Sequence, residues 1–224
     1  LWNLSPKDLR REMKKVLILG ADSFTGSHCK ENLTLFETKT TSRQEETGDF
    51  FFDCLNDDIS TILKNKNYDA LINCISMGDV DQCEENKSLA KKINYEFVKD
   101  LVKKVPKCTK LIHLSSNAVF DGNKSPYTEM DEKWPINYYG KLKNDADNYI
   151  VRHSSNFCIL RPITMFGYRL KHQRHNPFSF FFEKLSKNDE IVAVNDVYVN
   201  MLNVDYLIQS IEVVISKNLT GEFN

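Results

Sequence analysis

The sequence lacks an excess of charge of either sign, because its 30 Lys and Arg residues are matched by 31 Asp and Glu residues. This balance gives no electrostatic footprint for nucleic acid or for an anionic membrane, so we expect neither as a partner. No apolar run approaches the ~20 residues that a membrane-spanning helix needs. A chain of 224 residues is long enough for one sizeable core, or for one domain with a small lobe.

Cysteine occurs six times but never as a C-x-x-C pair. Several of these residues lie in apolar runs, as Cys74 does in 71–75, which is typical of reduced, buried thiols in a cytoplasmic protein. Cysteine and histidine do not cluster with the spacing of a zinc site, so we expect no metal. Met13 resembles a natural start, and we interpret residues 1–12 as an N-terminal extension or a cloning remnant.

Short apolar runs alternate with helix-like stretches from residue 13 to residue 167. The pattern predicts strands at 15–19, 39–42, 49–52, 70–75, 110–114 and 157–160, and helices at 24–33, 57–66, 87–104 and 138–153. This alternation favours an α/β class with a Rossmann-type doubly wound parallel sheet. Such sheets bind ligands at the carboxyl ends of their strands.

The pattern loosens after residue 167. It predicts a helix at 177–185, a strand at 191–194, a helix at 204–216 and the start of a strand at 221. We interpret 168–224 as a partial substrate-binding lobe interleaved with the Rossmann domain at 13–167. The phenylalanine cluster at 178–182 is expected either in the core or on the surface of a homodimer.

A turn of small residues follows the first predicted strand and opens the first helix. A tight turn there exposes backbone N–H groups at a helix N-terminus, which suits a pyrophosphate, although an ordinary strand-to-helix turn is the alternative. The turn residues expected to bind a dinucleotide are Gly20, Asp22, Ser23, Phe24, Thr25 and Gly26.

Ser42 and Arg43 stand at the end of the second predicted strand, where 40–42 contains no acidic residue. An acid at this position holds the ribose 2′-hydroxyl of NAD, whereas an arginine accommodates the 2′-phosphate of NADP. We therefore favour NADP(H) as the cofactor and keep NAD(H) as the alternative, since a solvated arginine also fits. Asp53, with Cys54 beside it, follows the third strand and either contacts the adenine or caps the next helix.

Tyr139 and Lys143 are four residues apart in a predicted helix, so they share one face. A lysine ammonium near a phenol favours the phenolate, and we expect the pKa of Tyr139 to fall from about 10 towards working pH. Such a tyrosine can protonate a carbonyl as hydride arrives. Ser116 can donate a hydrogen bond to the same oxygen, with Ser115 as its competitor, although chance spacing and capping hydroxyls would give the same pattern.

Together these features resemble the extended short-chain dehydrogenases/reductases, and within them the dTDP-4-dehydrorhamnose reductases and their relatives. The resemblance runs from 13 to 167 and thinly on to 224. It is carried by SSNAVFDG at 115–122, PYTE at 126–129 and PINYYGKLK at 135–143, with shorter matches at 73–84, 94 and 160–167. It implies NADPH-dependent reduction of a 4-keto group on a nucleotide-linked deoxysugar.

The resemblance also implies roles for individual residues. The catalytic residues would be Ser116, Tyr139 and Lys143, of which Lys143 would also hold the nicotinamide ribose. Further dinucleotide contacts would come from Cys74, Ile75, Ser76, Pro162 and Ile163, and substrate contacts from Ser115, Asn117 and Thr164.

The sequence departs from the family pattern at a few positions, and other functions remain open. Ser23 replaces the middle glycine of the turn, and Thr164 stands where rhamnose-type enzymes have Trp, so the sugar is undetermined. A sugar-nucleotide 4-epimerase that retains NAD uses the same Ser–Tyr–Lys set. A 4,6-dehydratase needs an Asp-Glu pair that Asn117-Ala118 does not supply. The regulatory β subunit of methionine adenosyltransferase resembles the same family, so a non-catalytic binding subunit is the third alternative.

Overall fold

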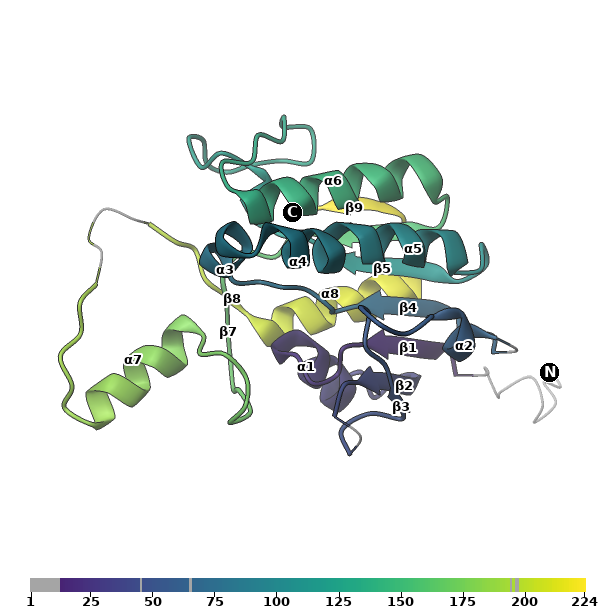
Figure 1. Cartoon of the computed structure of the whole chain (residues 1–224), viewed down its shortest axis with the longest axis horizontal. Coiled ribbons are helices and arrows are strands. Elements are labelled where there is room, and N and C mark those ends of the chain that lie inside the picture. Colours follow the sequence, from purple (N-terminus) through teal and green to yellow (C-terminus); the bar gives the residue numbers. More distant parts are fainter. Residues whose placement is uncertain (1–12, 45, 65, 194, 196–197) are drawn as a thin grey trace, which may run out of the picture.

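The computed structural model describes residues 13–44, 46–64, 66–193, 195 and 198–224, so the expected extension at 1–12 lies outside it (Figure 1). Seven parallel strands form the main sheet in the order β3-β2-β1-β4-β5-β6-β9. Their bounds are β1 Lys15–Leu19, β2 Glu37–Ser42, β3 Phe50–Phe51, β4 Ala70–Asn73, β5 Lys110–Leu114, β6 Phe157–Leu160 and β9 Gly221–Phe223. This architecture confirms the predicted α/β class with a doubly wound parallel sheet.

Strand β1 lies at the point where the order of the sheet reverses. Its Ile18 is in register with Thr40 of β2 on one side and with Ile72 of β4 on the other. The chain runs outward from β1 through β2 to β3 and then returns to place β4 beside β1. The crevice beyond the carboxyl ends of β1 and β4 is the place where doubly wound sheets bind ligands.

Helices cover both faces of this sheet (Figure 1). Val16 and Ile18 of β1 pack on the face covered by α1 (Phe24–Asn32) and α8 (Val204–Lys217). Leu17 and Leu19 pack on the face of α2 (Ser60–Leu63), α5 (Phe97–Lys104) and α6 (Tyr138–His153). Because every residue of such a strand faces a helix layer, the central strands are continuously apolar rather than alternating.

The segment between β4 and β5 differs from its prediction. A single helix was expected at 87–104, but α4 (Lys87–Lys91) and α5 are joined by a π-helical turn at Lys92–Glu96. The buried Asn94 lies in that turn, and its side chain bonds the backbone of Met77. Helix α3 (Val80–Glu85) had no prediction, because its sequence lacks an apolar stripe.

Helix α2 is much shorter than the predicted 57–66. Asp53 and Asp57 accept hydrogen bonds from backbone N–H groups of the 53–57 turn, and Asp58 accepts from Ser60. Short acidic side chains of this kind compete with the helix for backbone donors. The first part of the predicted helix is therefore a series of turns.

The chain leaves the main sheet after β6, packs α8 against it and rejoins it as β9. Strands β7 (Met165–Phe166) and β8 (Leu202–Asn203) form a small parallel pair, and α7 (Pro177–Ser186) stands apart on two long connections (Figure 1). No described residue of α7 is buried, so the phenylalanine cluster is not in the core. The strand expected at 191–194 is wrong at 191–193, and residue 194 lies outside the description. The predicted helix at 204–216 and strand at 221 are confirmed.

Within the part of the chain that the structure describes, no helix is both long and apolar enough to cross a membrane, and no three or more Cys, His, Asp or Glu side chains are grouped so that they could hold a metal ion. All six cysteines fall within the described ranges and are free thiols.

Helix α6 begins in close contact with the loop that follows β5. A Cβ added to Gly140 would lie 2.1 Å from the carbonyl oxygen of Ala118, in the 3₁₀ turn Asn117–Val119. Only glycine permits this approach, which brings Tyr139 to the loop that carries Ser116.

We expect Gly140→Ala to lower the free energy of unfolding by about 1–3 kcal/mol, because the clash with Ala118 is with backbone and cannot be relieved by a side-chain rotation. Alanine is intrinsically favoured over glycine in a helix by about 1 kcal/mol, so the variant is less stable only if the cost of the clash exceeds this gain. Chemical denaturation measures the change. The control is Gly78→Ala, where an added Cβ meets nothing within 4 Å and the expected change is within about 0.5 kcal/mol. Equal stability of the two variants would refute the close contact.

Candidate active site

The predicted catalytic residues lie together at the carboxyl edge of the sheet. Asn137 caps α6, since its Oδ1 accepts a hydrogen bond from Gly140 N at 2.8 Å. This cap fixes the start of the helix, so that Tyr139 lies in the first turn and Lys143 one turn further. Ser116 lies two residues beyond the end of β5, and its Oγ accepts from Ala118 N at 3.1 Å.

The phenol of Tyr139 lies near the hydroxyl groups of Ser116 and Ser76. Burial raises the pKa of the Tyr139 phenol above its ordinary value, and hydrogen bonding with Ser116 and Ser76 opposes this only in part. The expectation that Lys143 lowers this pKa is therefore wrong in direction. The physical reason is that desolvation of the phenolate outweighs the stabilising groups around it. Tyr139 consequently keeps its proton at neutral pH.

Lys143 is 1% exposed and turns its side chain towards the sheet. Its Nζ donates to the carbonyl oxygen of Leu114 at 2.6 Å. Burial lowers the pKa of Lys143 to about 8, and the charge of Asp147 opposes the shift. The ammonium group is thus close to losing its proton near physiological pH.

The two neighbouring serines have different surroundings. Ser116 lies beside Tyr139, whereas the hydroxyl of Ser115 is near enough to Asp147 to lower the pKa of that carboxyl group. Ser115 is also 5% exposed and its Oγ has no hydrogen-bond partner. Ser115 therefore lies in the layer beneath α6, near Asp147, and its side chain is not exposed to a substrate as expected. Ser116 is the serine whose geometry matches the catalytic role.

The glycine turn has the geometry expected of a dinucleotide site, with one change. Gly20 has φ +79, and a Cβ added to it would lie only 3.0 Å from Cγ1 of Ile75. Ser23 caps α1, because its Oγ accepts from Gly26 N at 3.1 Å and donates to Gly20 O at 2.7 Å. The first-turn amides of Phe24 and Thr25 have no partner inside the helix. They can face an anion, whereas the Gly26 amide is taken by Ser23.

Residues after β4 form the other wall of this crevice. Ile75 N donates to Asn73 Oδ1 at 3.1 Å, and Ser76 Oγ donates to Asn94 Oδ1 at 3.0 Å. Cys74 is buried with its thiol close to that of Cys29, so it contributes its backbone to the site rather than its side chain. Asp22 is held through its carbonyl oxygen, which accepts from the side chains of His172 and Gln173.

The residues expected at the adenosine end lie at the β2–β3 edge, away from Tyr139. Arg43 is exposed, while the buried Ser42 uses its hydroxyl in the local turn with Gln44 N and Thr47. Both carboxylate oxygens of Asp53 accept from its own turn, and α2 begins at Ser60 without a side-chain cap, so Asp53 does not cap the helix as the alternative expected. Burial raises the pKa of the Cys54 thiol to about 11, so it stays neutral. Arg43 is therefore an exposed positive charge at this end.

The loops after β5 and β6 meet at the substrate side. Asn117 N donates to Pro162 O at 3.3 Å, which places the half-buried Pro162 and Ile163 next to the loop of Ser116. The side chains of Asn117 and Thr164 are exposed, and the Thr164 carbonyl accepts from Leu202 N. Both side chains are accessible to a ligand.

The roles of two residues at the site, Asn94 and Asp147, were not predicted from the sequence. Asn94 appeared only as part of the resemblance, yet it holds Ser76 and Met77 in place. Asp147 received no role, although it lies four residues beyond Lys143 and so extends the stripe of Tyr139 and Lys143 along α6. Continuing the same spacing by one more turn would have found it.

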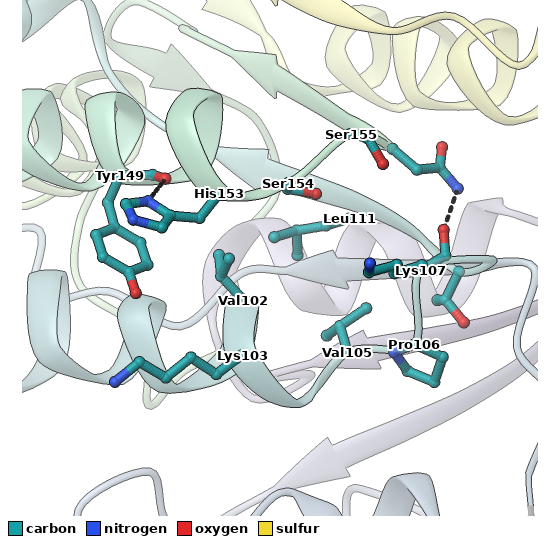
Figure 2. Close-up of a pocket in the computed structure, with 12 residues that line it drawn as sticks. Val102, Lys103, Val105, Pro106, Lys107, Leu111, Tyr149, His153, Ser154 and Ser155 are labelled. Atoms are coloured by element: carbon teal, nitrogen blue, oxygen red, sulfur yellow. Dashed lines mark hydrogen bonds between the residues drawn. The ribbon is translucent and has the colours of Figure 1, made fainter.

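A separate hollow of about 300 Å³ opens at the opposite edge of the sheet, near the C-terminal ends of α5 and α6 (Figure 2). Val102, Tyr149 and His153 line it, and His153 Nδ1 lies 2.9 Å from Tyr149 O. It contains none of the catalytic or dinucleotide residues discussed above. We therefore place the active site at the carboxyl edge and not in this hollow.

Comparison with known proteins relates the chain to a described family. The family model described as RmlD substrate binding domain matches residues 13–222. Methionine adenosyltransferase 2 subunit beta of Danio rerio is 26% identical over 149 residues, which are 65% of this chain and 46% of the relative. The chain thus spans less than half the length of that relative.

Solved structures give a similar picture. The dTDP-4-dehydrorhamnose reductase of Clostridium acetobutylicum is 27% identical with a TM-score of 0.82, and the match covers 93% of this chain and 72% of that one. The dTDP-4-dehydrorhamnose reductase of Bacillus anthracis, solved in complex with NADP, has a TM-score of 0.84 at 22% identity over 94% of this chain and 73% of its own. The second likeness shows the fold alone.

The Ser23 cap leads to a stability prediction. Ser23→Ala removes the acceptor of Gly26 N and should lower the free energy of unfolding by about 1 kcal/mol, whereas Ser23→Gly should cost only a few tenths. Ser210→Ala, at an exposed position inside α8, is the control and should change it by less than about 0.5 kcal/mol. Urea denaturation of the three variants gives the comparison. If Ser23→Ala were as stable as the parent protein, the cap would have no energetic role.

Proposed function

The chain belongs to the RmlD substrate binding domain family, and on this premise we propose that it is a cytoplasmic NADPH-dependent reductase of a 4-keto-deoxysugar nucleotide, of the dTDP-4-dehydrorhamnose reductase type. One observation carries the proposal. Tyr139 lies among the hydroxyls of Ser116 and Ser76, one helical turn from the buried Lys143, on the same sheet edge as the glycine turn.

Tyr139 is the proton donor in this proposal. When bound, NADPH supplies the hydride that reduces the keto carbon. Because its pKa is raised by burial, Tyr139 is protonated at neutral pH and can give its proton to the carbonyl oxygen as a general acid. Ser116 orients that oxygen by donating a hydrogen bond to it. The charge of Lys143 stabilises the phenolate that remains on Tyr139.

The residues present fit a dinucleotide. The Phe24 and Thr25 amides at the start of α1 suit its pyrophosphate. Gly20 has no side chain, so the cofactor could approach the backbone of the turn closely there. Arg43 suits a 2′-phosphate, and Lys143 would hold the nicotinamide ribose. Asn117 and Thr164 are the proposed contacts to the sugar nucleotide.

A second function is favoured by the curated relative. Since methionine adenosyltransferase 2 subunit beta is similar over 65% of the chain, a non-catalytic subunit that binds a dinucleotide and a partner protein is the alternative. A turnover assay separates the two proposals, because a binding subunit retains the dinucleotide site but does not reduce a substrate.

We expect Tyr139→Phe to lower the turnover of a 4-keto-sugar nucleotide by at least about 100-fold, which is the usual contribution of a general acid. NADPH binding should be retained, since the change removes one hydroxyl. Tyr138→Phe is the matched control, because Tyr138 is adjacent on α6 but lies over Lys87, and its activity should match that of the parent protein. NADPH oxidation followed by absorbance measures turnover. Bound NADPH without turnover in the parent protein would favour the binding subunit.

Cofactor choice tests Arg43. Arg43→Ala should weaken NADPH binding by about 10- to 100-fold, the loss of one charge-assisted contact, and should leave NADH binding nearly unchanged. Arg152→Ala, an exposed arginine in the last turn of α6 at the opposite edge, is the control. Fluorescence titration with both cofactors gives the two affinities. Equal affinity for both, or NAD retained through purification, would instead favour the epimerase.

A further inference from the structure

The buried stripe of α6 continues past Lys143 to a carboxyl group. Asp147 lies one turn further along the helix and has no exposed surface. Among the acidic side chains that the structure describes, it is the one classed as buried. Acidic groups are seldom buried completely unless they are paired, so the groups around Asp147 indicate its role.

One oxygen of Asp147 is paired with a buried arginine. Arg161 Nε donates to Asp147 Oδ2 at 3.0 Å, and the guanidinium is 1% exposed. The same guanidinium donates to Glu222 and Asn224, in and just after β9. Arg161 follows β6, so the pair joins α6 to the end of the sheet and holds Asp147 in one position.

The other oxygen of Asp147 is left without a partner. Oδ1 is buried and has no hydrogen bond of ordinary geometry, although the Ser115 hydroxyl, itself without such a bond, lies close enough to lower the pKa of this carboxyl group. Lys143 is buried as well, and Leu114 O is the partner of its ammonium group, which has three donors. A spare acceptor and spare donors therefore lie one helical turn apart, on the same face of α6.

We propose that Asp147 is a positioning residue: its carboxylate, held by Arg161, supplies the negative charge that keeps the Lys143 ammonium protonated and fixed behind Tyr139. Two cations, Lys143 and Arg161, share this desolvated layer. Without a nearby anion, neither positive charge would be compensated. Lysine would then release its proton, because the arginine guanidinium stays protonated in proteins. The consequence for turnover rests on the proposed function, but the charge of Lys143 does not.

The other groups near Lys143 do not supply this charge. Burial holds the pKa of His113, on β5, well below its usual range, so this side chain is neutral at physiological pH. The pKa of Cys74, beyond β4, is raised by Cys29 and by burial, so its thiol is neutral too. Tyr139, one turn earlier on α6, is protonated. Asp147 is the remaining source of negative charge among these neighbours.

The groups that face Asp147 come from several elements. Burial raises the pKa of Asp147, whereas Arg161, Ser115, Lys143 and Lys133 lower it. Three of these four neighbours are cationic. They favour the ionised carboxylate that the role requires, and Arg161 makes the shortest contact.

The experiment follows the side-chain nitrogen of Lys143 by NMR of ¹⁵N-lysine-labelled protein across a pH titration, with the signal assigned by Lys143→Met. We expect the midpoint to fall by about one pH unit or more in Asp147→Asn, because the ammonium loses the negative charge that raises its pKa. Asp147→Glu keeps the negative charge, so its Lys143 midpoint should stay close to that of the parent protein. Asp145→Asn, the same chemical change on the same helix, should leave it where it is in the parent protein.

Turnover provides a second measurement. A midpoint that moves from about 8 to about 7 lowers the protonated fraction at pH 8 from one half to about one tenth, so kcat at pH 8 should fall about fivefold in Asp147→Asn and much less at pH 6. A parent protein without turnover would refute the proposed function, while the titration of Lys143 would still decide the role of Asp147. An unchanged midpoint in Asp147→Asn would overturn the proposal.

Removing Asp147 alone leaves Arg161 partly uncompensated, so the variant can fail to fold. In that case the titration uses Asp147→Asn combined with Arg161→Gln, which removes both charges and keeps a polar side chain at each position. Asp147, and not Arg161, is among the groups that shift the pKa of Lys143. The midpoint should therefore still fall in the double variant, and an unchanged midpoint there would equally overturn the proposal.

Discussion

The start of α6 is the constraint on which the site depends. The Asn137 cap sets the first turn of the helix, and the contact of Gly140 with the Ala118 carbonyl sets its distance from the loop after β5. Once these two contacts are made, the helical repeat determines where Tyr139 and Lys143 lie. Ser116 is placed independently by β5, so the match between helix and strand is what brings the phenol and the hydroxyl together.

Desolvation then gives this geometry its chemical character. The same layer that excludes water raises the pKa of Tyr139 and lowers that of Lys143, so both groups are shifted towards their uncharged forms. A proton donor benefits from this shift, because it must carry its proton when the substrate arrives. For Lys143 the shift is unfavourable, because burial lowers its pKa while its proposed role requires the protonated ammonium group. Burial of a carboxylate in the same layer compensates for that penalty without admitting solvent.

Much of the fold could be predicted from the sequence, because strands buried on both faces leave continuous apolar runs such as 15–19 and 110–114. Helix interruptions could not, since the π-helical turn around Asn94 depends on a side chain that bonds Met77, far from it in sequence. The aspartates at 53–58 were assigned to a helix because periodicity does not register turn bonds made by short side chains. The direction of the Tyr139 pKa was mispredicted for a similar reason: spacing identifies a neighbouring charge but not the depth of burial.

Strand β9 contributes to the site although it lies far from it along the chain. Glu222 and Asn224 hold the guanidinium that holds Asp147, across 61 and 63 residues of sequence. Strand β9 pairs with β6, so together with the residue that follows it, β9 supplies two of the acceptors around the Arg161 guanidinium. A change that separates β9 from β6 would therefore remove partners from the ion-pair layer beneath α6 as well as the last strand of the sheet.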